Sequence, residues 1–332
     1  MTDSLHMRAL IVDSADAPLR LASIERPEPA AGQVLVRIAA SGVNPLDGKI
    51  RSGQAAHARQ PLPAVLGMDL AGTVEAVGEG VSSWKPGDEV YAMATGIGGA
   101  QGSLAEYAVV DARLLAGKPG NLSMREAAAL PLILITAWEG LVDRAQVRAG
   151  HRVLIHGGAG GVGHVAVQIA RAFGAEVFAT GSKRHKEIIE GLGAVFIDHR
   201  ECSVEDYVAK YTDGEGFDIV YDTVGGEVLD ASFKAARVYQ GHVVSCLGWG
   251  QHSLAPLSFR GATYSGVFTL LPLLTGHGRD HHGAILRDAA RLIEAGSLKP
   301  ILDPHQFTLQ TAEAAHALLL SGAAQGRLVI EI

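Results

Sequence analysis

The chain has 332 residues, more than one hydrophobic core usually supports, so we expect two compact units. Apolar residues make up 48% of the chain and charged residues 19%, which excludes the disordered and fibrous classes. The formal net charge is −7 and the basic residues are scattered, so nucleic acid is not an expected partner. Only Cys202 and Cys246 occur, which excludes a disulfide framework and predicts a cytoplasmic location.

No membrane segment is expected. The longest apolar run, Ala127–Trp138, is interrupted by Pro131 and is shorter than the roughly 20 residues that span a bilayer. The first residues contain Asp3 and lack a basic region followed by an apolar one, so the sequence predicts no secretory signal and no membrane partner.

The first part of the chain, from Met7 to about Ser123, has the pattern of a β-rich unit. Short β-branched runs alternate there with proline and glycine turns. The runs that we expect to be strands are Met7–Val12, Val34–Ala39, Gly72–Val77 and Glu89–Met93. A barrel or a partly open sandwich is the expected architecture.

The pattern changes near Ser123-Met-Arg-Glu126, which is typical of a capping box that opens a helix. Buried-looking strands then alternate with helical stretches, which predicts a doubly wound parallel six-stranded sheet of the Rossmann kind. The expected strands are Val153–His156, Glu176–Thr180, Val195–Asp198, Ile219–Thr223, Gly241–Leu247 and Ala262–Phe268.

The last part of the chain contains an amphipathic helix around Gly283–Ala295 and a final strand, Arg327–Ile332, which we expect to return to the first unit. The predicted boundaries are 1–124 and 269–332 for the two parts of the β-rich unit, and 125–268 for the Rossmann unit.

A glycine motif follows the strand Val153–His156 and opens a helix, in the order Gly158-x-Gly160-x-x-Gly163. We expect Gly158 to permit a tight turn, Gly160 to let a pyrophosphate approach, and Gly163 to let the helix pack closely on the strand. The helix N-terminus would then face the anion. The alternative is a flexible turn without a ligand, but the flanking strand and helix favour dinucleotide binding.

The end of the second Rossmann strand predicts which dinucleotide binds. An enzyme that uses NAD usually has Asp or Glu there, whereas this chain has Ser182, Lys183 and Arg184. Their hydroxyl and cationic groups suit a 2′-phosphate, so NADPH is favoured over NADH. The alternative is that Lys183 and Arg184 are solvated residues opening the next helix.

Several motifs in order make the chain resemble the medium-chain dehydrogenase/reductases from end to end. They are Pro63–Gly72, Val77–Asp88, Ala105–Tyr107 and Ala127–Trp138. The resemblance implies a GroES-like catalytic domain, built from both ends of the chain, and a Rossmann domain. Asn44 and Met68 stand where the zinc-dependent branch has ligands, and the chain lacks the cysteines of a structural zinc lobe, so we expect no metal.

The loop Val43–Gly53 is similar to one in zinc-independent quinone oxidoreductases of the zeta-crystallin type. That resemblance implies that Asn44 contacts the nicotinamide ribose, that Thr136 contacts the nicotinamide, and that Lys49, where many relatives have Tyr, lies near the substrate. A solvated loop cation is the alternative for Lys49. The expected cofactor-binding residues are Gly158, Gly160, Gly161, Val162, Gly163, Ser182, Lys183, Arg184, His199, Thr223, Leu247 and Arg327.

The predicted function is zinc-independent hydride transfer from NADPH to quinones or conjugated carbonyls. Two alternatives stay open: an NADPH-dependent enoyl or alkenal double-bond reductase, and a noncatalytic, crystallin-like NADPH-binding protein. The family further suggests a homodimer that pairs through Ala262–Phe268, because an exposed apolar edge strand is otherwise an aggregation risk.

Overall fold

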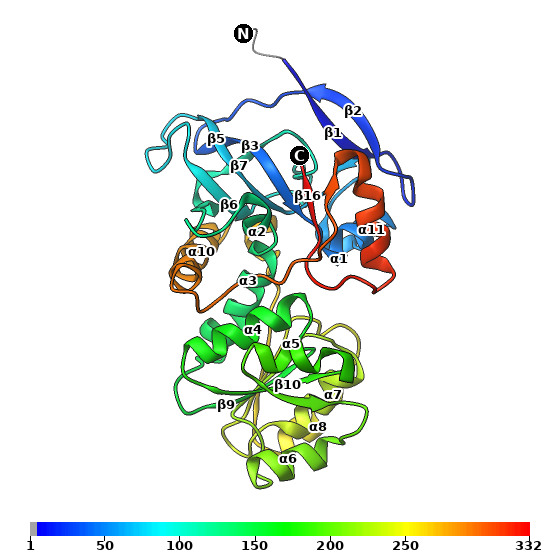
Figure 1. Ribbon diagram of the computed structural model, residues 1–332, viewed down its shortest axis with the longest axis vertical. Helices are drawn as coiled ribbons and strands as arrows, with labels where there is room; N and C mark the ends of the chain where they lie inside the picture. Colours follow the sequence, from blue (N-terminus) through cyan, green and yellow to red (C-terminus); the bar gives the residue numbers. More distant parts are fainter. Residues whose placement is uncertain (1–4) are drawn as a thin grey trace. The chain divides into compact units, whose positions relative to one another are not determined.

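The computed structural model describes residues 5–332, which form two compact units (Figure 1). The first unit contains the chain up to Leu132, Leu270–Ala295 and Pro300–Ile332. The second unit contains Ile133–Thr269 and Gly296–Lys299. Each unit is therefore assembled from segments that are separated in the sequence.

The first unit is rich in β-structure, as predicted. A three-stranded sheet has the order β2-β1-β4, and a seven-stranded sheet has the order β15-β16-β3-β5-β6-β8, with β7 pairing with β3. The strands are β1 (His6–Val12), β2 (Arg20–Glu25), β3 (Gln33–Gly42), β4 (Ala64–Val65), β5 (Asp69–Val77), β6 (Glu89–Met93), β7 (Tyr107–Asp111), β8 (Ala116–Gly117), β15 (Phe307–Thr308) and β16 (Val329–Glu331). The late strand β16 pairs antiparallel with β3, so the end of the sequence completes a sheet that its beginning starts.

Six α-helices begin in or belong to the first unit among the described residues. They are α1 (Pro45–Arg51), α2 (Met124–Ala128), α3 (Pro131–Trp138), α9 (Leu271–Thr275), α10 (Arg279–Glu294) and α11 (Ala312–Leu320). The capping box is confirmed, since Ser123 Oγ accepts a hydrogen bond from Glu126 N at 3.2 Å. The predicted helix in the last part of the chain begins four residues earlier than expected, after Gly278 (φ 84°), while α11 was not predicted.

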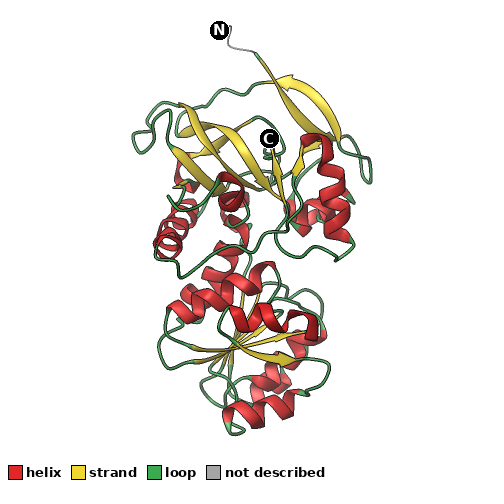
Figure 2. Ribbon diagram, viewed as in Figure 1, coloured by secondary structure: helices red, strands yellow, loops and turns green. Residues whose placement is uncertain are grey.

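The second unit is the predicted doubly wound parallel sheet, with the strand order β11-β10-β9-β12-β13-β14. Its strands are β9 (Arg152–His156), β10 (Glu176–Gly181), β11 (Val195–Asp198), β12 (Ile219–Asp222), β13 (His242–Ser245) and β14 (Thr263–Gly266). Helices α4 (Gly161–Ala172), α5 (Lys186–Gly191), α6 (Val204–Thr212), α7 (Glu227–Ala235) and α8 (Ala255–Phe259) cover both faces (Figure 2).

Aromatic and branched side chains fill one face of this sheet. Phe178 of β10 packs against Phe217 with ring centroids 5.3 Å apart, and Leu154, Val220 and Phe233 are buried in the same cluster. The inner strands β9, β10, β12 and β13 appear in the sequence as apolar runs because both of their faces are covered. No helix in residues 5–332 has the length and apolar character needed to cross a membrane.

Candidate functional site

The turn between β9 and α4 has the close packing that the glycine motif predicted. A Cβ at Gly163 would collide with the carbonyl oxygen of Gly157 and would lie 3.0 Å from the Cα of Gly158. The positive φ of the turn (72°) is at Gly157, one residue before the first glycine of the predicted motif. Gly158 is required for packing instead, because a Cβ there would lie 2.5 Å from the Cβ of Ala179 in β10.

The N-terminus of α4 offers unpaired donors to an anion. Gly160 is the N-cap and provides no side-chain cap, and the first turn of this 12-residue helix contains no acidic residue. The first N–H groups of a helix have no acceptor within it, so the amides of Gly161, Val162 and Gly163 remain available. Gly160 is exposed, and its missing side chain leaves the approach to these amides open. This geometry fits a dinucleotide pyrophosphate.

A buried carboxylate that the sequence analysis missed orders the neighbouring loops. Asp222, at the end of β12, accepts hydrogen bonds from Val224 N and Gly225 N, both at 2.9 Å, and from Ser245 Oγ at 2.7 Å. It thereby fixes the segments after β12 and β13, which carry the predicted residues Thr223 and Leu247. The signal was present in the sequence as an acidic residue that ends an apolar strand and precedes two glycines.

These loops lie at the same sheet edge as the glycine turn, because His156 is in register with Asp222, and Asp222 with Ser245. Thr223 Oγ1 donates to the carbonyl of His156 at 2.6 Å. The ring Nδ1 of His156 lies 3.1 Å from Thr180 Oγ1, and burial lowers the pKa of His156 to about 4. His156 is thus neutral, and its contacts with Thr180 and Thr223 hold the residues next to the glycine turn in place.

The end of β10 presents cations without carboxylates. Lys183 and Arg184 are exposed and have no ion-pair partner among residues 5–332. Ser182 is half-buried, with its Oγ 3.3 Å from His185 Nδ1, and His199 Nδ1 lies 2.9 Å from the carbonyl oxygen of Gly181. Burial, followed by the charges of Arg184 and His199, lowers the pKa of His185. The positive charge at this position therefore comes from Lys183 and Arg184.

Thr136, in α3, is tied to the Rossmann sheet. Its Oγ1 lies 2.9 Å from Thr269 Oγ1, and its carbonyl accepts a hydrogen bond from the Tyr221 hydroxyl of β12 at 2.7 Å. Gly140 leaves the space for Tyr221, since a Cβ there would lie 2.7 Å from the tyrosine ring. Thr136 is thus held by buried contacts within the second unit.

Asn44 and Arg327 lie in a buried polar network of the first unit. Asn44 Nδ2 donates to Asp69 Oδ2 at 2.9 Å, and Asn44 Oδ1 accepts from an Arg327 terminal nitrogen at 2.8 Å. Arg327 Nε donates to the carbonyl of Ala129 at 3.0 Å. The backbone N–H of Asn44 donates to Asp47 Oδ2 at 2.8 Å at the start of α1. The structure thus engages Asn44 in contacts that the sequence analysis did not foresee.

The network contains two carboxyls and one guanidinium, all buried. Burial raises the pKa of Asp47 to about 7 and that of Asp69 to about 6, although Arg327 opposes both shifts. Asp47 Oδ1 has no hydrogen-bond partner, which fits a carboxyl that keeps its proton. The network is close to neutral when Asp47 is protonated and Asp69 pairs with Arg327.

Lys49, in α1, is exposed, and its side chain forms no ion pair with any described residue. It lies one turn beyond Asn44 in the chain. Within residues 5–332 the structure has no group of three or more His, Cys, Asp or Glu side chains that could hold a metal ion.

The strand order and the glycine turn define a dinucleotide-binding α/β protein with a second, β-rich unit. Comparison with known families agrees with this class. Residues 30–120 match the family described as "Alcohol dehydrogenase GroES-like domain", and residues 192–330 match the one described as "Zinc-binding dehydrogenase".

Individual relatives cover nearly the whole chain. The 2-methylene-furan-3-one reductase of Solanum lycopersicum is 38% identical over 315 residues, which are 92% of this chain and 73% of that protein. The human quinone oxidoreductase is 33% identical over 332 residues, 98% of this chain and 97% of that protein. A solved alcohol dehydrogenase superfamily protein from Novosphingobium aromaticivorans is 56% identical, with a TM-score of 0.96 and coverage of 98% and 99% of the two chains.

The chain therefore belongs to the medium-chain dehydrogenase/reductase family, among relatives that include quinone oxidoreductases. The family assignment supports an oxidoreductase activity and a nicotinamide cofactor, and the turn before α4 has the form that such a cofactor requires.

Proposed function

We propose that this protein uses NADPH to reduce quinones or other conjugated carbonyl compounds. The observation that carries the proposal combines two features: the tightly packed glycine turn before α4, and the end of β10, where Lys183 and Arg184 lie without a carboxylate beside them in the chain. The similarity to a quinone oxidoreductase and to a 2-methylene-furan-3-one reductase supports an electron-poor, conjugated acceptor. When bound, NADPH would supply a hydride from the nicotinamide ring.

The residues of this chain would bind and position the two reactants. The amides of Gly161, Val162 and Gly163 would hold the pyrophosphate, while Ser182, Lys183 and Arg184 would hold the 2′-phosphate through charge-assisted hydrogen bonds. We propose that His199, Thr223 and Leu247 line the same cofactor site, because each lies at or beside a carboxyl end of a Rossmann strand. We further propose that Thr136 contacts the nicotinamide.

Negative charge develops on the acceptor oxygen during hydride transfer and must be stabilised by hydrogen-bond donors. Lys49 is the donor best able to do this in the first unit, since its ammonium group is exposed and has no partner. Asn44 and Arg327 would act mainly by fixing the start of α1 through the buried network. A contact of either residue with the cofactor would come in addition to this structural role. Replacement of Lys49 by Met should therefore lower kcat more than it changes NADPH affinity.

The proposal is tested by NADPH oxidation with purified protein and three acceptors: a benzoquinone, a conjugated alkenal and a crotonyl thioester, with NADH in parallel. Turnover with benzoquinone that prefers NADPH supports the quinone activity. A preference for the alkenal or the thioester favours the second candidate, a double-bond reductase, for which the 38% identity to the furanone reductase is the specific support. Tight NADPH binding without turnover of any acceptor contradicts both.

The coenzyme preference has its own test. The double variant Lys183→Ala, Arg184→Ala should lower the ratio of NADPH to NADH efficiency by roughly tenfold or more, because charge-assisted hydrogen bonds to the 2′-phosphate are lost. Lys234→Ala is the matched control, since Lys234 is exposed on α7 of the same unit and lies away from β10. An unchanged ratio in the double variant contradicts the assignment.

We also propose a homodimer that pairs through β14, which is one of the two edge strands of the second unit's sheet. Sedimentation of the protein at several concentrations would give the mass of the particle. A monomer at all concentrations would contradict this proposal.

A further inference from the structure

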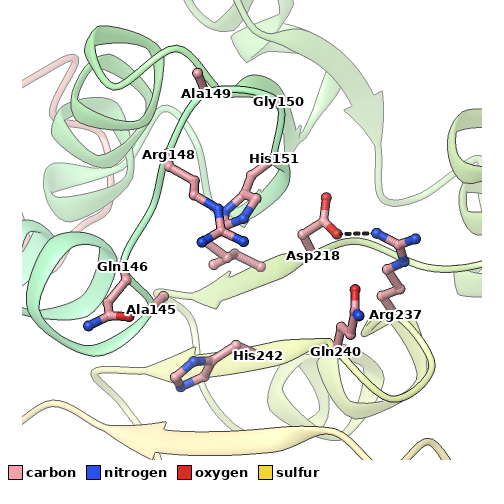
Figure 3. Close-up of a pocket in the computed structure, with 11 residues that line it drawn as sticks. Ala145, Gln146, Arg148, Ala149, Gly150, His151, Asp218, Arg237, Gln240 and His242 are labelled. Atoms are coloured by element: carbon pink, nitrogen blue, oxygen red, sulfur yellow. Dashed lines mark hydrogen bonds and ion pairs between the residues drawn. The ribbon is translucent and has the colours of Figure 1, made fainter.

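A pocket of about 580 Å³ opens at the amino ends of β9, β12 and β13, within the second unit (Figure 3). The side chains that matter for its chemistry belong to Arg148, His151, Asp218, Arg237, Gln240 and His242. We refer to it as the amino-end pocket. Because the strands are parallel, it lies at the edge opposite to the glycine turn, and the five residues of β9 separate the two by about 16 Å.

The one carboxylate of the amino-end pocket is already satisfied. Asp218 Oδ2 accepts a hydrogen bond from the backbone N–H of Arg152 at 2.8 Å. Asp218 Oδ1 accepts from Arg237 Nη1, also at 2.8 Å. The carboxylate therefore cancels the charge of Arg237 and has its two oxygens occupied, so it is a poor partner for a further cation.

Arg148 is the uncompensated charge in this pocket. It lines the same pocket as His151 (Figure 3), its charge contributes to lowering the pKa of that ring, and its guanidinium has no hydrogen bond or ion pair with any of residues 5–332. Arg148 is exposed at the rim of the pocket, where its five N–H donors, without an acceptor, match the geometry of a carboxylate or phosphoryl group.

The two histidines add neutral polar groups. Burial lowers the pKa of His151, with a further lowering by Arg148 that Asp218 opposes, and burial also lowers the pKa of His242. Both rings are therefore neutral at pH 7. The Nδ1 atom of His151 is buried and has no hydrogen-bond partner. The pocket thus carries a net charge of about +1 and at least one polar atom that lacks a partner.

We propose that the amino-end pocket is a second ligand site, distinct from the dinucleotide site, that binds a small metabolite bearing one carboxylate or phosphoryl group. Arg148 pairs with the anionic group, and the amide of Gln240 binds a polar group on the rest of the molecule. The volume lies within the range of roughly 300–1,000 Å³ typical of small-molecule sites, so the ligand is larger than an inorganic ion.

The proposal is tested by ligand-observed NMR titration of the full chain at low ionic strength. The probes are glycerol 3-phosphate, glycerate and glycerol, which share a carbon skeleton and differ in carrying a phosphoryl group, a carboxylate or no charge. Each titration is run with and without saturating NADP⁺. An anion held at the glycine turn is displaced by NADP⁺, whereas one in the amino-end pocket is not, so this result does not depend on the proposed reductase activity.

Three variants assign the binding to named side chains. Arg148→Gln should weaken the affinity for the charged probe by roughly tenfold, and Asp218→Asn should strengthen it, because the charge of Arg237 is then uncompensated. The control is Arg144→Gln, since Arg144 is exposed four residues earlier and does not line the pocket; its affinity should match the wild-type value.

The site is supported if either charged probe binds in the presence of NADP⁺, with an affinity that is lower in Arg148→Gln and higher in Asp218→Asn. The charged probe that binds more tightly shows whether the site prefers a carboxylate or a phosphoryl group. Equal affinity for glycerol, an unchanged affinity in Arg148→Gln, or no binding at tens of millimolar overturns it. Thermal unfolding of each variant distinguishes a loss of probe binding from a loss of the fold.

Discussion

Gly163→Ala should damage both the stability of the second unit and its dinucleotide affinity. The added Cβ would fall against the carbonyl oxygen of Gly157, 2.8 Å from the carbonyl carbon and 3.0 Å from the Cα of Gly158. All three atoms belong to backbone, so the turn must move relative to α4. Overpacking of this kind costs about 1–3 kcal/mol of unfolding free energy.

The same movement misplaces the amides that we assign to the pyrophosphate. Loss of one charge-assisted hydrogen bond costs about 1.5–3 kcal/mol, which corresponds to a roughly ten- to hundredfold rise in Kd. The unfolding free energy is measured by urea titration, and NADPH affinity by calorimetry. Gly191→Ala is the control, because a Cβ at Gly191 has no atom within 4 Å, and its unfolding free energy should stay level or rise slightly. Wild-type stability and affinity in Gly163→Ala would refute the argument.

Four further predictions follow from the same structure. Gly160→Ala should keep its stability within about 1 kcal/mol, since its Cβ meets only the Gly157 oxygen at 3.1 Å, yet should bind NADPH more weakly; calorimetry and urea titration separate the two effects. A raised pKa in Asp47 means that the folded protein holds a proton that the unfolded chain releases, so this group's contribution to stability falls as pH rises from about 4 to about 7. Asp47→Asn removes this titrating group. The unfolding free energy of the variant, relative to that of the wild type, should therefore rise between pH 5 and pH 8 by an amount on the order of 2–4 kcal/mol. If the difference between the two unfolding free energies does not change with pH, burial does not raise the pKa of Asp47. Ser123→Ala should cost about 1 kcal/mol in urea titration through loss of the cap on α2, and no loss would show that Glu126 caps the helix alone. Dialysis against a chelator should leave the rate of NADPH oxidation unchanged, and a rate restored by Zn²⁺ would overturn the expectation of zinc independence.

The sequence predicted the Rossmann unit more fully than the β-rich one. The four inner strands, β9, β10, β12 and β13, are buried on both faces and appear as apolar runs. All six strands of this sheet were found within one or two residues of their bounds. In the first unit, β2 was missed because its residues are mostly exposed or half-buried and show no apolar run, and α11 was missed because its alanines and leucines carry little amphipathic pattern.

The candidate site was predictable where local geometry decides the residue. The role of Gly163 follows from the motif, whereas the positive φ at Gly157 is a property of the folded turn. The partners of Asn44 could not be derived in the same way. Asp69 and Arg327 are 25 and 283 residues away from it in the sequence, and only the folded chain brings them together. Likewise, nothing in the sequence separates Arg148, which lacks a partner, from Arg237, which has one.

The position of β16 has a consequence for how this protein is made. A ribosome completes β3 early, but the strand that pairs with its outer edge comes from residues 329–331. Until β16 is made, residues 40–42 of β3 lack this partner, whereas the second unit has its whole sheet once residue 266 has been made. The sheet of the Rossmann unit can therefore form during synthesis, before β16 completes the sheet of the β-rich unit.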